Sequence, residues 1–106
     1  MPKYLFQGSY QPDGTKGLMK EGASQRRANL EGLIKQQGGR LETFYFTFGD
    51  ADAIGIAELP DNVTAAALSM AVNASGAVVV KTTVLLSVEE MDQAAKKQVG
   101  YRPPGH

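Results

Sequence analysis

Hydrophobic and polar residues alternate along parts of this chain and recur with helical spacing along others. Alternation predicts four β-strands, at residues 3–10, 40–48, 53–59 and 77–86. Helical spacing predicts three helices, at residues 15–37, 63–75 and 87–99. The predicted order is therefore strand, helix, strand, strand, helix, strand, helix, followed by a tail at 100–106 that contains two prolines and is expected to be extended.

Short polar or glycine-containing segments separate these elements. Residues 11–14, Gln-Pro-Asp-Gly, predict a turn after the first strand. Gly22 predicts a kink or a break in the first helix. Ser24 follows at a position where it could cap the N-terminus of a new helix. Residues 38–39, both glycine, end that helix. Residues 87–90, Ser-Val-Glu-Glu, form the sequence of a capping box and open the last helix.

The segment Gly49-Asp50-Ala51-Asp52 predicts the turn of a central β-hairpin between the second and third strands. Its two aspartates could act as a carboxylate pair, either for acid–base chemistry or for a cation. Turns favour aspartate because its side chain accepts hydrogen bonds from nearby backbone N–H groups. A structural role is therefore the favoured interpretation of both Asp50 and Asp52.

The order of the elements is the βαββαβ arrangement of ferredoxin-like folds. It predicts an α+β fold within one domain of residues 1–106: a four-stranded antiparallel sheet with helices on one face, plus a short C-terminal helix. Strict alternation in the second strand predicts one face with Glu42, Phe44, Phe46 and Phe48, and another with Leu41, Thr43, Tyr45 and Thr47. Because both sheet faces carry apolar residues, the uncovered face is predicted to pack on a second copy, which gives a dimeric α+β barrel.

One face of the third strand is almost bare, because it carries only Ala53, Gly55 and Ala57. A bare strand face lets a helix, a strand of a partner or a ligand approach closely. The other face of the same strand carries the bulkier Ile54 and Ile56.

Composition narrows the classes of partner and cofactor. Eleven basic and eleven acidic residues cancel, so neither nucleic acid nor a membrane surface is an expected partner. Cysteine is absent and His106 is the only histidine, so thiolate ligands and an internal imidazole are missing. We therefore expect no metal and no cofactor. No signal peptide and no apolar run of transmembrane length are visible, which predicts a soluble, cytoplasmic domain.

Polar residues on the predicted uncovered face are the candidates for a ligand site. The ligand-binding candidates, which could line a semi-polar cavity between the sheet and a partner, are Gln7, Ser9, Thr43, Thr47 and Thr83. The candidates for chemistry are Tyr45, Lys81 and Asp52, since an enclosed lysine can act as a base or form an imine. The alternative interpretation is a solvent-exposed or dimer-contacting face with scattered polar groups, and strand alternation alone favours it.

Two basic segments have open interpretations. Arg26 and Arg27 could bind a phosphate or a carboxylate. Adjacent arginines on a helix are more often solvated or paired with a nearby acid such as Glu31, and this is the favoured interpretation. The tail segment Tyr101-Arg102-Pro103-Pro104 is either disordered or lies across a neighbouring subunit as a clamp, and we favour the clamp.

Several segments together resemble the GYD domain family. They are residues 3–10 (Lys-Tyr-Leu-Phe-Gln-Gly-Ser-Tyr), the turn 49–52, the run 71–76 that leads into 80–85, and the tail 99–105. The resemblance implies the dimeric α+β barrel group, whose members include small monooxygenases, isomerases, haem-using enzymes and ligand-sensing domains. It implies no established activity and supplies no catalytic residues. The chain departs from the family's glycine, tyrosine and aspartate signature at Ala51, where the family has tyrosine.

Three functional hypotheses follow from these features. The first is a homo-oligomeric barrel that binds a small, largely apolar molecule, with any chemistry limited to cofactor-independent proton transfer or oxygenation. The second is a non-catalytic self-assembly or regulatory module, for which the two-sided sheet and the tail are the support. The third, a haem-dependent monooxygenase, rests on analogy between folds, and the missing internal histidine argues against it.

Overall fold

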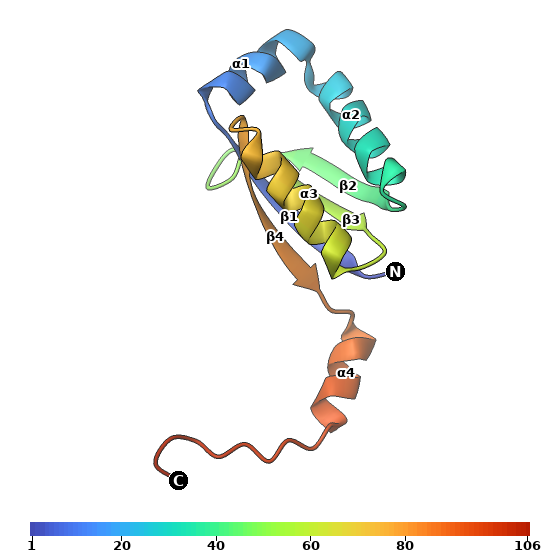
Figure 1. Ribbon diagram of the computed structural model, residues 1–106, viewed down its shortest axis with the longest axis vertical. Helices are drawn as coiled ribbons and strands as arrows, with labels where there is room; N and C mark the ends of the chain where they lie inside the picture. Colours follow the sequence, from blue (N-terminus) through green and yellow to red (C-terminus); the bar gives the residue numbers. More distant parts are fainter.

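The computed structural model describes residues 1–106 and contains one four-stranded antiparallel sheet and four helices. The elements are β1 Lys3–Tyr10, α1 Pro12–Glu21, α2 Ala23–Gln36, β2 Arg40–Phe46, β3 Ala53–Glu58, α3 Asn62–Ala74, β4 Val78–Leu85 and α4 Val88–Lys96. The strands lie in the order β2-β3-β1-β4; α2 and α3 lie on one side of the sheet, and α1 lies beyond the end of the sheet at which β1 finishes (Figure 1). This confirms the predicted α+β fold. No helix has both the length and the apolar character needed to span a membrane.

The first predicted helix is two helices, and it begins earlier than the turn chemistry indicated. Gly22 has a φ of 92°, in the region that favours glycine, and it separates α1 from α2 as predicted. The predicted turn at residues 11–14 is wrong, because Pro12 is the first residue of α1. Proline suits that position, since its fixed φ is helical and its missing N–H has no partner there anyway. Met19 on α1 is exposed.

A β-bulge in β2 overturns the predicted alternation of that strand. The register with β3 shifts between Leu41 and Thr43, so Glu42 is an extra residue without a partner opposite. A single inserted residue moves the side chains before it to the other face. Leu41 therefore packs against the helix-side core, and Glu42 lies on the same face as Thr43. The predicted grouping of Glu42 with the phenylalanines, and of Leu41 with the threonines, is wrong.

The hairpin turn is also longer than predicted. β2 ends at Phe46 rather than at residue 48, and residues 47–52 connect it to β3. Phe48 lies in this connection and is fully exposed. The predicted position of Phe48 on a strand face is therefore wrong, although the hairpin itself is confirmed by the pairing of β2 with β3.

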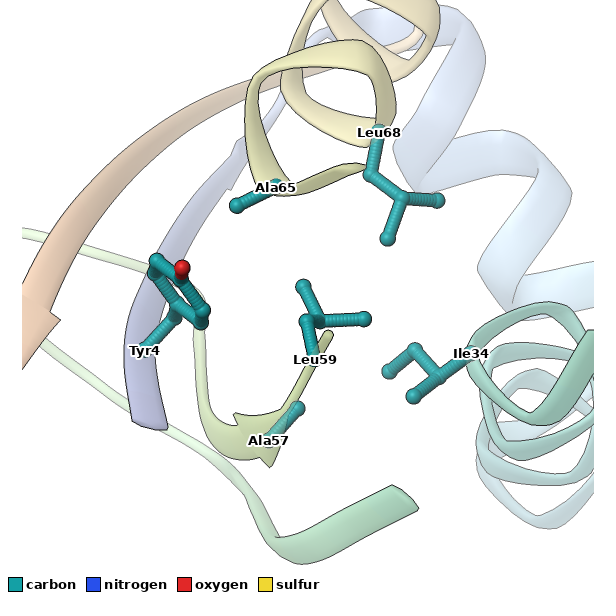
Figure 2. Packing of buried hydrophobic residues seen from close by; sticks show 6 residues of the cluster. All are labelled: Tyr4, Ile34, Ala57, Leu59, Ala65 and Leu68. Atoms are coloured by element: carbon teal, nitrogen blue, oxygen red, sulfur yellow. The ribbon is translucent and has the colours of Figure 1, made fainter. Parts of the chain in front are cut away.

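The fully packed core is small and centres on Leu59, directly after β3. Figure 2 shows Leu59 between side chains of α3 and α2, with the ring of Tyr4 nearby. The cluster consists of Tyr4, Ile34, Ala57, Leu59, Ala65 and Leu68. The hydroxyl of Tyr4 donates a hydrogen bond of 2.6 Å to the side-chain oxygen of Asn62 at the start of α3. This bond satisfies the polar end of an otherwise buried ring.

Polar side chains fix α3 at both of its ends. Asp61 caps its N-terminus, accepting hydrogen bonds from the Thr64 N–H at 2.8 Å and the Thr64 hydroxyl at 2.7 Å. The bond from the Thr64 backbone N–H holds the pKa of Asp61 below its usual value. Near the other end, the Asn73 side chain bonds the backbone of β4 at Val80: its oxygen accepts from the N–H at 2.7 Å, and its amide donates to the carbonyl at 3.4 Å.

The C-terminal helix stands away from the rest of the molecule. Figure 1 shows α4 and the tail extending from the end of β4, beyond the sheet and the other helices. The predicted capping box is confirmed: the Glu90 N–H donates to the Ser87 hydroxyl, and the Ser87 N–H donates to the Glu90 carboxylate. Every residue of α4 is exposed, including Val88 and Met91 on one side of it. The longest dimension of the chain is therefore 57 Å.

Candidate functional site

The sheet face opposite the helices, here called the open face, is not covered by α1, α2 or α3 (Figure 1). Its side chains form rows across the strands, which the pairing register defines. One row is Thr43, Ile56, Leu5 and Thr83; the next is Tyr45, Ile54, Gln7 and Lys81. Val79 lies beyond these rows with 48% of its surface exposed, and Tyr45 has 67% exposed. The open face is thus a mixture of aliphatic and polar groups.

The structure brings most of the predicted site residues together on this open face. They are Gln7, Ser9, Thr43, Tyr45, Lys81 and Thr83. Gln7 is next to Lys81 in the register, and Tyr45 lies across Ile54 from Gln7. Three groups that can donate or accept hydrogen bonds are therefore aligned across the middle of the sheet.

The other two predicted residues, Asp52 and Thr47, lie in the hairpin connection and not on the open face. The Asp52 carboxylate accepts the Tyr10 N–H at 2.8 Å, and the Asp52 N–H donates to the Gly8 carbonyl at 2.8 Å. Thr47 donates its N–H to the Asp52 carbonyl at 2.8 Å and its hydroxyl to the Ala51 carbonyl. These bonds tie the hairpin connection to β1, which is the structural role that turn chemistry favours for Asp52.

A cluster of charges occupies one end of the open face. Glu42 accepts from Lys3 at 2.8 Å and from Arg40 at 3.3 Å, and Arg40 also reaches Glu58 at 3.2 Å. The hydrogen bond between Lys3 and Glu42 raises the pKa of Lys3 and lowers the pKa of Glu42. All four side chains remain partly exposed, so this cluster contributes orientation and solubility more than stability.

An apolar cavity of about 90 Å³ lies on the other side of the sheet, between the sheet and helices α2 and α3. Gly8 on β1 and Ala53 and Gly55 on β3 lie in its floor, together with larger apolar side chains of the strands, among them Phe6 and Phe44. Leu30 and Leu33 of α2 lie on one side, and Leu68 and Val72 of α3 on the other. Ala53 and Gly55 belong to the bare face of β3 noted in the sequence, which lets another element or a ligand approach the strand closely.

A wider cleft of about 470 Å³ adjoins this cavity, between α1, α2, the end of α3 and the start of β4. Its volume is in the range of small-molecule pockets. The residues that line both spaces are Tyr10, Arg26, Leu30, Leu33, Val72 and Val78. Arg26, which could bind a phosphate or a carboxylate, lines both spaces, whereas none of the ligand-binding and chemistry candidates predicted for the open face lines either one. Sequence patterns missed this pocket because its shape depends on the distance between helices that are far apart along the chain.

No group of three or more His, Cys, Asp or Glu side chains is arranged to hold a metal ion. Comparison with protein-family models finds a match to the GYD domain over residues 4–95. The chain belongs to the GYD domain family. The predicted membership of this family is therefore confirmed; the tail segment 99–105 lies outside the matched residues. Comparisons of this GYD domain with curated proteins and with solved structures give no match. In this GYD domain the Ala51 carbonyl accepts a hydrogen bond from the Thr47 hydroxyl in the hairpin connection.

Proposed function

We propose that this GYD domain is a homo-oligomeric domain that binds a small, largely apolar molecule between the open faces of two copies. The support for association is the aliphatic part of the open face: Leu5, Ile54 and Ile56 are neighbours on β1 and β3, and Val79 lies further along the face on β4. No helix of the same chain covers this face (Figure 1). A sheet face of this kind is normally covered, either by further elements or by a second sheet. A second copy supplies that sheet by symmetry.

The polar row across the middle of the open face supports a bound molecule. Gln7, Tyr45 and Lys81 make no hydrogen bond to another side chain of their own subunit. In a closed interface these groups would be buried without partners, which is costly. A ligand with one or two polar atoms and an apolar body satisfies them while filling the space beside Ile54 and Ile56. Tyr45 and Lys81 are the two groups of the row that can exchange a proton with such a ligand.

Association through the open face is tested by placing a charge in its aliphatic row. Wild-type protein is expected to be a dimer in solution by light scattering coupled to size exclusion, and Ile56→Asp is expected to be a folded monomer. The matched control is Val63→Asp, which charges an exposed valine on α3 away from this face. A monomeric wild type at tens of micromolar protein, or a dimeric Ile56→Asp, contradicts the proposed interface.

Ligand binding is tested by native mass spectrometry of the wild-type oligomer, purified without denaturation. Exchange of one polar group for an apolar one of similar length, Gln7→Leu or Lys81→Met, is expected to remove a co-purifying mass and to leave the dimer intact. A dimer that carries no additional mass, with its interface fully filled by side chains, refutes the ligand and leaves only self-association.

A second candidate, a non-catalytic assembly module, is favoured by the exposed C-terminal region. The exposed apolar residues Leu86, Val88, Met91, Val99 and Tyr101 all lie beyond β4, on a segment that extends away from the sheet. Deleting residues 100–106 tests whether the tail clamps a neighbour. The mass in solution gives the number of subunits. If the shortened chain assembles into the same number of subunits as the wild type, the tail is not the clamp.

A further inference from the structure

We propose that the pocket on the helix side of the sheet binds an aliphatic carboxylate. The chain of the ligand would occupy the apolar cavity, and its carboxylate would pair with Arg26 where the cavity meets the wider cleft. This site lies on the opposite side of the sheet from the proposed dimer interface, so it stands independently of that interface.

The cavity is built to accept hydrocarbon. On the sheet side its lining combines the small residues Gly8, Ala53 and Gly55 with larger apolar ones such as Phe6 and Phe44, and on the helix side it is mainly leucine and valine from α2 and α3. Ser69 is a polar residue in this lining, and its hydroxyl is already engaged with the Ala65 carbonyl and the Thr82 hydroxyl. A ligand chain therefore meets almost no unsatisfied polar group inside the cavity. Water gains little there, whereas an apolar group gains the free energy of leaving water.

Arg26 supplies the polar end of the site. Its Nε–H is buried and has no hydrogen-bond partner. Its neighbour Arg27 is different, since Arg27 pairs with Glu31 at 3.0 Å on the outer surface of α2. An unpaired donor on a cation is costly to bury, so a carboxylate at this point would gain both a charge-assisted hydrogen bond and an ion pair. The favoured interpretation, that these arginines are solvated or paired, holds for Arg27; the Nε–H of the half-buried Arg26 is neither exposed nor paired.

The acidic residues of the wider cleft do not fulfil this role. Asp13 and Glu21 line the cleft, but neither forms an ion pair with Arg26. Glu21 instead accepts a hydrogen bond from the Asn29 side chain. Their negative charge opposes a phosphate or any other dianion. Arg26 is the one cationic residue that lines either space, so a single negative charge on an apolar body is the matching chemistry.

The direct test is calorimetric titration of the full chain with sodium octanoate, kept below the concentration at which octanoate aggregates. Wild-type protein is expected to bind octanoate and to bind 1-octanol at least about tenfold more weakly, because the alcohol lacks the charge that Arg26 pairs with. Arg26→Met keeps the aliphatic stem and removes the charge, and it is expected to lose about tenfold or more in octanoate affinity. Arg27→Met is the matched control and should bind as wild type does.

A second variant and a stability measurement keep the test decisive. Leu30→Phe places a larger side chain in the cavity, which reduces its free volume, and leaves Arg26 in place. It should therefore weaken octanoate binding without changing the preference for acid over alcohol. Octanoate should raise the melting temperature of wild-type protein and of Arg27→Met, but not that of Arg26→Met. No octanoate binding to wild type, equal binding to Arg26→Met, or equal binding of octanol would each overturn the proposal.

Discussion

Truncation of Leu59 tests whether the buried cluster around this residue provides most of the free energy of unfolding. Leu59 is fully buried at the centre of a core of only six residues. Leu59→Ala removes three carbon atoms, worth about 2.4 kcal/mol of transfer free energy at ~0.8 kcal/mol each. The cavity that remains adds to this, so the expected loss is about 3–5 kcal/mol. The Leu59 backbone N–H keeps its bond to the Pro2 carbonyl at 3.1 Å, which confines the change to the side chain.

Such a loss is a large part of the stability of a chain of this size, which is typically about 5–15 kcal/mol. It corresponds to a fall in melting temperature of about 12 °C or more. Urea unfolding followed by circular dichroism, at one fixed protein concentration, measures it directly. The control Val63→Ala truncates an exposed valine on α3 and should change the free energy of unfolding by less than about 0.5 kcal/mol. A Leu59→Ala loss below about 1 kcal/mol would show that the cluster in Figure 2 is not the core.

Two further predictions concern single aspartates. Asp52→Ala removes the acceptor of the Tyr10 N–H, so it should lower the free energy of unfolding, measured with urea, by about 1–2 kcal/mol. Asp50→Ala, in the same connection, is the control. An equal loss for both variants would contradict the anchoring role of Asp52. Asp61→Ala removes the cap of α3 and should destabilise the protein at pH 7. Because the bond from Thr64 lowers the pKa of Asp61, the stabilisation is present above the unfolded pKa and is lost as pH falls through the folded one. The difference from wild type should therefore shrink in acid, and a difference that is constant with pH would exclude the ionised cap.

The sequence was sufficient for the type and order of the elements, because alternation and helical spacing are strong over whole strands and helices. It was also sufficient for Gly22 and for the capping box at Ser87, where the chemistry is local. It failed at Glu42, since inserting one residue reverses the faces without changing the composition of the strand. It also failed at Pro12, because proline is compatible with a turn and with the first position of a helix.

Of the two candidate sites, the sequence could predict one and not the other. The residues of the open face could be grouped from strand alternation, and the register then placed Tyr45, Gln7 and Lys81 in one row. The pocket on the helix side could not be found in this way. Its existence depends on how far α2 lies from α3 above the sheet, which is a long-range property. The sequence also cannot show which of the adjacent residues Arg26 and Arg27 faces the pocket, because the two side chains are the same.

The side chain of Asn73 has a consequence for how the sheet can grow. β4 is an edge strand, and edge strands expose backbone groups to which another chain can add. At Val80 the Asn73 amide occupies both of these groups, as the peptide of an added strand would. On the opposite edge, the bulge at Glu42 interrupts the regular spacing of β2. Addition of a further strand, which is how sheets extend into fibrils, is therefore obstructed at Val80 on one edge of the sheet and at Glu42 on the other.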